Sequence, residues 1–230
     1  MSKYSIEEFI RQNASPASTG SFFELENSKT LRINLTQKVL TKVGAMIAYT
    51  GNITFKKQGS TEQGLGMMFK KMVSGEGMTM MRAEGNGVLY CADGGKNVKV
   101  LHLQNQTISV NGNDVLALEE SLSYDIVRLK ASTGFVSGNA FNMKISGTGM
   151  VAISVHGDPL MLIVTPDKPV FTDGDATVAW DGGLQPEIKT DISWKDFIGK
   201  SSGESVQFAF RGNGWVLVQP YEEQPIATKE

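Results

Sequence analysis

The sequence predicts an all-β fold, mainly β-strands with a few short helices, built from three related β subdomains. One pattern occurs three times: an opening glycine, an alternating run, a Gly-x-Gly triplet nine or ten residues later, and an apolar run. No long helical period and no alternation of strands with helices interrupts these patterns. The triplets begin at Gly85, Gly147 and Gly212.

A second landmark has the same period. An apolar-Ala-apolar triplet precedes each Gly-x-Gly, and another apolar residue follows its alanine five positions later. The alanines are 69 and 62 residues apart, and the turn glycines are 62 and 65 apart. A period near 65 exceeds the roughly 20 to 50 residues of solenoid and propeller repeats and favours small β subdomains. The alanines are Ala48, Ala117 and Ala179, and the later apolar residues are Ile53, Leu122 and Leu184.

The Gly-x-Gly triplets predict three β-hairpins. Glycine supplies the positive φ that tight hairpin turns require, and the alternating and apolar runs on either side are typical of strands. The chain has the length of one large β domain or two small domains. The repeats are expected at approximately 22–104, 105–160 and 161–220, with a frayed tail over 221–230.

The first element is a short amphipathic helix over residues 4–12. Ser5 and Glu8 form a capping box, and Ile6, Phe9 and Ile10 share one face. We expect this helix to dock on the sheet; an anchor for a membrane or a partner protein is the alternative.

Strands follow along the chain, separated by glycine, proline and Asp-Gly turns. A helical insertion over 63–73 and a brief helical turn over 194–198 interrupt them. Gly44 and the run Asp173-Gly174-Asp175 are expected to be turns. The expected strands are 22–25, 30–35, 38–43, 45–49, 97–103, 107–110, 124–130 and 160–164.

Composition excludes several classes of protein. The 230 residues have a formal charge of −2, which gives no general attraction to nucleic acid. The first 12 residues lack the apolar core of a secretory signal, and no stretch has the length of a membrane span, so we expect a cytoplasmic protein. Seven basic and four acidic residues give +3 over 56–99, and two basic and seven acidic residues give −5 over 156–191. Such complementary segments can steer self-association, although solvated loops give the same pattern.

No residues are assigned to a catalytic, cofactor or metal site. Cys91, the single cysteine, lies in an apolar run and is expected to be a small core residue. His102 is expected at the surface or satisfied in the core, and His156 at a turn; the two lack partners at metal-ligand spacing. Residues 147–152 fit a dinucleotide fingerprint in letters only, because a strand and not a helix follows.

The threefold plan resembles the AIM24 family over nearly the whole chain. The similar segments are Val43 to Ala48, Asp173 to Trp180, and Gly212-Asn213-Gly214 followed by Val216 to Gln219. The resemblance implies a single domain over residues 1–230 with a β-sandwich or barrel architecture like that of the tryptophan RNA-binding attenuator protein. Its three related subdomains would lie around a pseudo-threefold axis. The resemblance places the chain with bacterial members to which no activity is assigned, whereas mitochondrial relatives are associated with inner-membrane organisation. It supplies no catalytic residues and transfers neither tryptophan nor RNA binding.

The function expected from these features is that of a non-enzymatic scaffold or protein-interaction module, bound to a partner protein or to itself through its strand edges. The alternative is a β module that binds a small ligand or carbohydrate in a pocket between subdomains. Nucleic-acid binding is a third, less favoured hypothesis. No cofactor is expected.

Overall fold

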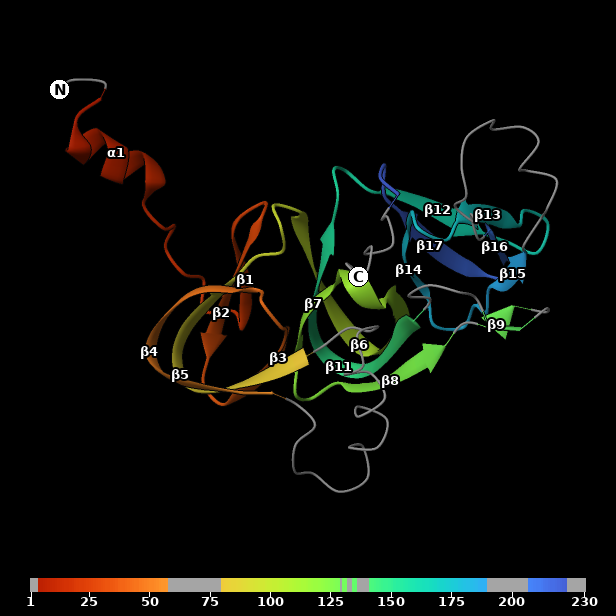
Figure 1. Ribbon diagram of the computed structural model, residues 1–230, viewed down its shortest axis with the longest axis horizontal. Coiled ribbons are helices and arrows are strands. Elements are labelled where there is room, and N and C mark those ends of the chain that lie inside the picture. The colour runs from red at the N-terminus through yellow and green to blue at the C-terminus, as the bar shows by residue number, and fades with distance from the viewer. Residues whose placement is uncertain are drawn as a thin grey trace, which may run out of the picture.

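The structure is a computed structural model that describes residues 4–57, 80–128, 130–131, 134–135, 141–189 and 207–222. Within these residues it is dominated by antiparallel strands, as the sequence predicts, with one α-helix (Figure 1). The predicted insertion at 63–73, the helical turn at 194–198 and most of the tail lie outside the described residues.

Helix α1 (Ile6–Asn13) begins at the capping residue that the sequence indicates. The backbone N–H of Glu8 donates to Ser5 Oγ at 3.2 Å. The expected docking of this helix on the sheet is wrong, since none of its residues is buried and it stands apart from the strands in Figure 1. A helix of eight residues presents too little apolar area to hold it against the body.

The first group of strands, which we call the first unit, is arranged around β5. Strands β2 and β3 follow one another along one edge of β5, and β4 covers the full length of the other edge. Strand β1 extends the sheet beyond β2. The strands are β1 (Phe23–Asn27), β2 (Thr30–Leu35), β3 (Lys38–Lys42), β4 (Met46–Lys57) and β5 (Met80–Cys91).

The second unit has the same pairing around β11. The long strand β6 covers one edge of β11, while β7 and β8 follow one another along the other edge. A short hairpin, β9 with β10, lies between β8 and β11 in the chain. The elements are β6 (Asn97–Asn111), the 3-10 helix η1 (Gly112–Asp114), β7 (Val115–Glu119), β8 (Ser123–Arg128), β9 (Lys130–Ala131), β10 (Gly134–Phe135) and β11 (Phe141–Val155).

The third unit divides its central strand into two, β16 and β17. Strand β17 lies between β12 and β14, and β16 lies between β13 and β15. The order of pairing along the chain therefore matches that in the first two units. The strands are β12 (Leu160–Val164), β13 (Val170–Asp173), β14 (Thr177–Asp181), β15 (Glu187–Lys189), β16 (Gln207–Phe210) and β17 (Gly214–Val218).

The three hairpins predicted at Gly-x-Gly are wrong, because each triplet bends a chain that continues forward. Residues 85–87 and 147–149 lie inside β5 and β11, and residues 212–214 lead from β16 to β17, which have different partners. The first glycine of each triplet has a φ of 136°, 123° and 115° in turn. A bent strand and a hairpin share the pattern of an alternating run, a glycine turn and an apolar run.

The apolar-Ala-apolar triplets mark a β-bulge in each unit. The residue before each alanine is skipped in the pairing with the central strand: Ile47 in β4, Leu116 in β7 and Val178 in β14. A bulge increases the local twist of a strand. The apolar residue five positions after the alanine is buried beside the glycine bend, as for Leu122 at Gly147. Both sequence landmarks therefore mark bends in the strands of each unit.

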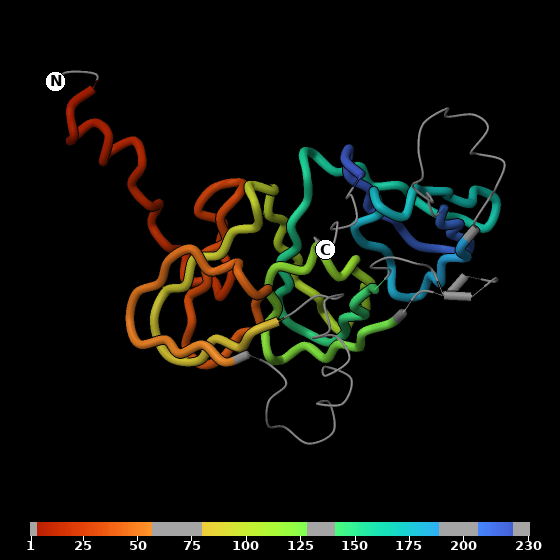
Figure 2. Tube along the Cα trace, in the orientation of Figure 1, coloured from red at the N-terminus to blue at the C-terminus, as the bar shows by residue number. Residues whose placement is uncertain are grey.

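Strand pairing joins the units in a row. Strand β3 of the first unit pairs with β7 of the second, and β6 of the second pairs with β14 of the third. Figures 1 and 2 show the first unit at one end of the molecule, the second in the middle and the third at the other end. In the part of the chain that the structure describes, no strand of the first unit pairs with a strand of the third. The pseudo-threefold axis and the likeness to the attenuator protein stay predictions.

The core follows the same division. One apolar cluster fills the first unit and includes Leu116 and Ala117 of β7, and a second fills the middle unit and includes Val178 and Ala179 of β14. A third cluster surrounds Trp180, whose ring lies 5.6 Å from that of Phe210. Each bulge in β7 and β14 thus inserts side chains into the core of the preceding unit.

Candidate functional site

A network of charged and polar groups lies where the first unit meets the second. Lys42, at the end of β3, donates from Nζ to Asp93 Oδ2 at 2.8 Å and to the backbone carbonyl oxygen of Asn113 at 2.7 Å. Ser154 in β11 donates from Oγ to the same oxygen of Asp93 at 2.6 Å. The carboxylate of Asp93 therefore receives two hydrogen bonds from two different units.

A second ion pair continues this network. Lys96 Nζ lies 3.0 Å from Asp114 Oδ1, and the Asp114 side chain is fully buried. Burying a carboxylate is costly unless a cation accompanies it, so Lys96 offsets the desolvation of Asp114. The network connects β3, the β5–β6 connection, η1 and β11.

The pKa of Asp93 shows how these contacts balance. Burial acts to raise the pKa, but the hydrogen bonds from Lys42 and Ser154 and the charges of Lys42 and Lys96 outweigh it and hold the pKa below its usual value. The carboxylate is therefore ionised at neutral pH and paired with cations.

This network combines a serine with a lysine and an aspartate, but its geometry is that of a structural site. Ser154 is fully buried, and its hydroxyl donates to a carboxylate whose lowered pKa makes it a poor base. A catalytic nucleophile must reach its substrate, and a general base works best with a pKa near the working pH. The arrangement holds two units together and offers no attack on a substrate.

The residues weighed for chemistry in the sequence lie apart from one another. Cys91 is buried in the first core, which raises the pKa of its thiol to about 12, so its prediction as a core residue is confirmed. His102 is exposed on β6, and the ring of His156 stacks on Tyr221 at 3.9 Å between ring centroids. Asp173 Oδ1 accepts from the backbone N–H of Asp175 at 2.8 Å, as expected of a turn.

Within the described residues, no three histidine, cysteine, aspartate or glutamate side chains come together in a way that could hold a metal ion. None of the helices formed by those residues has the length and apolar character that crossing a bilayer requires.

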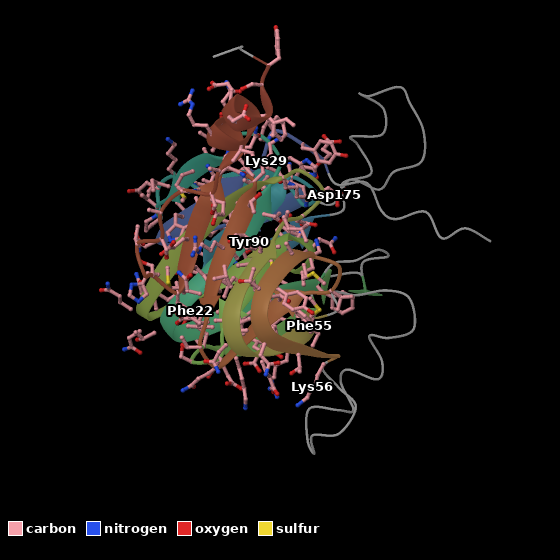
Figure 3. All side chains as sticks on the ribbon, turned by 90° about the vertical axis from the view of Figure 1, so that its left-hand side faces the viewer. Phe22, Lys29, Phe55, Lys56, Tyr90 and Asp175 are labelled. Carbon is pink, nitrogen blue, oxygen red and sulfur yellow. The ribbon has the colours of Figure 1, made fainter. Side chains whose placement is uncertain are left out.

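Strand β4 has a different kind of surface, formed by exposed apolar side chains. It pairs with β5 along one edge, and its first half exposes Met46, Ile47 and Tyr49 to solvent. Figure 3 views the molecule from the first unit, so that β4, with Phe55 and Lys56 in its second half, faces the reader. The Tyr49 and Phe55 rings meet edge to face with 5.4 Å between centroids. We call residues 46–50 the β4 edge.

A second exposed edge lies on the third unit, at the opposite end of the row (Figure 1). Among the described strands, β12 ends the large sheet and β13 ends the three-stranded sheet, so each has one edge paired with another described strand. We call this the β12–β13 edge, and its exposed apolar side chains are Leu160, Met161, Ile163 and Phe171. Exposed apolar side chains on open strands are typical of surfaces that bind protein.

Helix α1 adds a third exposed apolar group at the same end of the molecule as the β4 edge. Ile6, Phe9 and Ile10 are all more than half exposed. The apolar spacing of the helix is visible in the sequence. The exposure of the two strand edges is not, because the same runs would be core residues in a closed sheet.

Comparisons with known proteins agree with this architecture. The chain is similar to a Streptococcus pyogenes protein of known X-ray structure, with a TM-score of 0.66 and 22% sequence identity over 87% of this chain and 92% of that chain. At this identity the likeness shows the fold alone. A search of curated proteins gave no match. Residues 23–221 match the family described as mitochondrial biogenesis AIM24. Since this match spans most of the sequence, the chain belongs to the AIM24 family.

Proposed function

We propose that the protein is a non-enzymatic scaffold in the cytoplasm, built from three copies of one β module, whose open strand edges bind other protein strands. The observation that supports this most is the exposure of apolar side chains along the β4 edge and the β12–β13 edge. Unpaired backbone groups on such strands bind an added strand, while neighbouring side chains give specificity.

The three-copy proposal rests on the shared strand pairing and on the bulges at Ile47, Leu116 and Val178. The second copy is taken to begin at β6. The boundary expected at residues 104 and 105 falls inside that strand, whose whole length pairs with β11. Modules that join through the pairing of their edge strands suit a scaffold, because each copy presents the same kind of binding surface.

The buried network at the first junction supports a role without catalysis. Its serine, lysines and carboxylates are used in bonds between units, and Ser154 has no exposed surface. A scaffold needs such fixed junctions, since the spacing of its binding edges depends on them.

The proposal is tested by co-purification from native cells followed by mass spectrometry. The test variant is Ile163→Lys on β12, and the matched control is Leu25→Lys on β1, which makes the same kind of change at another exposed strand position. We expect proteins other than the chain itself to be retained by the wild type and the control and lost with Ile163→Lys. A wild type that retains no other protein, or loss with both variants alike, would contradict the proposal.

A further inference from the structure

The two junctions between units use one register. At the first, Leu40 of β3 lies opposite Leu118 of β7, and Thr41 lies opposite Ala117. At the second, Ser109 of β6 lies opposite Trp180 of β14, and Val110 lies opposite Ala179. In both cases the landmark alanine pairs with the strand of the preceding unit. The middle unit therefore has one strand, β7, that pairs with the unit before it and another, β6, that pairs with the unit after it.

The first unit has the strand that would pair with a preceding unit, but among the described residues β4 pairs with β5 alone. Alignment on the bulges places Ile47 and Tyr49 of β4 where Leu116 and Leu118 lie in β7. The β7 side chains are fully buried, whereas Ile47 is 57% and Tyr49 46% exposed. The β4 edge thus has the side chains of a junction, and no strand that the structure describes covers them.

The third unit shows the complementary feature. Alignment on the glycine bends places Phe171 of β13 where Leu40 lies in β3 and where Ser109 lies in β6. Leu40 and Ser109 are each 4% exposed because the following unit covers them, whereas Phe171 is 46% exposed. The β12–β13 edge is the side of a junction that would meet a following unit.

From these two edges we infer that one copy of the chain binds a second copy head to tail, with β13 of the first copy antiparallel to β4 of the second. The register of the existing junctions places Phe171 opposite Tyr49, Val170 opposite Thr50, and Thr172 opposite Ala48. This inference rests on the proposed function and names the chain itself as the partner. The pair of aromatic side chains at its centre corresponds to Leu40 with Leu118 at the first junction.

The bulge adds a second contact. Leu116 lies in the core cluster of the first unit, and Val178 lies in that of the second, so each bulged side chain enters the preceding core. Ile47 is the bulged residue of β4 and enters the third core of the neighbouring copy in the same way. Burial of this side chain supplies the apolar part of the contact.

The repeated register favours a second copy as the occupant. Strand β3 meets β7 and β6 meets β14 at equivalent positions, so β13 has the positions that meet a strand of the type of β4. Within one copy β4 and β13 lie at opposite ends of the row (Figure 1), which keeps them apart. The contact joins two different surfaces of the chain. Repeated contacts therefore form a closed ring if the rotation between successive copies divides a full turn, and a filament if it does not.

The register is tested by disulfide formation between two single variants of the full-length chain, Tyr49→Cys and Phe171→Cys. Directly opposed residues in antiparallel strands have Cα atoms about 4.5–5.5 Å apart, which a disulfide can span. A mixture of the two variants is expected to form a crosslinked dimer under mild oxidation, and each variant alone is not. The native Cys91 is buried and present in all samples.

The matched control replaces Tyr49→Cys by Val127→Cys, an exposed apolar position on β8. Its mixture with Phe171→Cys should give little dimer. The inference is overturned if this control crosslinks as well as the test pair, if Tyr49→Cys crosslinks with itself as readily, or if no dimer forms. A chain with both cysteines that crosslinks only within itself would also overturn it.

A charge pair tests the contact without cysteine. The double variants Tyr49→Lys with Phe171→Glu and Tyr49→Lys with Phe171→Lys differ only in the sign of the charge at residue 171. The first should associate at least tenfold more tightly than the second in sedimentation, and high salt should reduce the difference. Equal association of the two would contradict the inference. If self-association fails while other proteins still require Ile163, the scaffold proposal stands and this inference alone falls.

Discussion

At the scale of single residues, Asp93 shows how the chain fixes the first junction. Its carboxylate accepts from Lys42 of β3 and from Ser154 of β11, so one side chain connects strands that are far apart in the sequence. Hydrogen bonds to a charged group contribute about 1.5–3 kcal/mol each when their partners are held in place. Removing the charge therefore leaves a partly buried ammonium without its carboxylate.

We expect Asp93→Asn to lower the free energy of unfolding at pH 7 by about 1–3 kcal/mol. Because the pKa of Asp93 is lower in the folded protein than in the unfolded chain, its contribution is complete above the unfolded value of about 4 and is lost as the pH falls through the folded value. Urea unfolding at several pH values measures this, with the exposed Asp158→Asn as control. If the stability difference between the wild type and Asp93→Asn were as large in acid as at pH 7, the account would be contradicted.

The glycine bends can be tested at the same scale. Gly87 has a φ of 158° and lies so close to β4 that an added Cβ would collide with the backbone oxygen of Thr50. Gly44, with a φ of 84°, has open space around its Cβ position and serves as the matched control.

Gly44→Ala should cost about 1 kcal/mol of stability through backbone strain alone. Gly87→Ala should cost at least about 2 kcal/mol more, because the backbone of β4 or β5 must shift. Thermal and urea unfolding compare the two variants. Equal losses would show that the second glycine of the triplet is not required for the close approach of the strands.

At the scale of elements, the most informative comparison is between β4 and β7. Both have a bulge before their alanine and both pair with a central strand, yet the first half of β4 is exposed on both faces and β7 is buried on both. The difference lies in what surrounds the strands, since β7 has β3 along its second edge.

Two alanine variants measure that difference. Leu116→Ala removes a fully buried side chain from the first core and should cost about 2–5 kcal/mol. Ile47→Ala, at the equivalent position of β4, should change the stability of a dilute sample by less than about 0.5 kcal/mol, because an exposed side chain makes few contacts. A large loss for dilute Ile47→Ala would mean that β4 is already covered within one copy.

Many of the strands and the start of the helix could be predicted from the sequence, and the wrong predictions have physical causes. The bounds of β2 and β12 and the cap at Ser5 follow from alternation, turn residues and capping chemistry. The hairpins failed because local pattern does not distinguish a strand that reverses from one that bends. Docking of α1 failed because an apolar helix face shows that contact is possible without showing that a surface lies within reach.

At the scale of the whole molecule, three units lie in a row, and among the described strands the joining edges at the two ends of the row have no partner. The sequence contains the period of the units and the apolar residues of both edges, but it does not show which edges remain open. That information comes from the long-range pairing of β3 with β7 and of β6 with β14. The junction network around Asp93 was missed for the same reason, since its hydrogen-bonded partners are separated by up to 71 residues in the chain.

Sedimentation equilibrium of the wild-type chain over a wide range of concentration tests the central claim most directly. Head-to-tail association predicts a mass that rises above the 25.0 kDa of one chain towards whole multiples of it, and a return to one chain when Tyr49 and Phe171 are both replaced by lysine. A mass of 25.0 kDa at every concentration would contradict it.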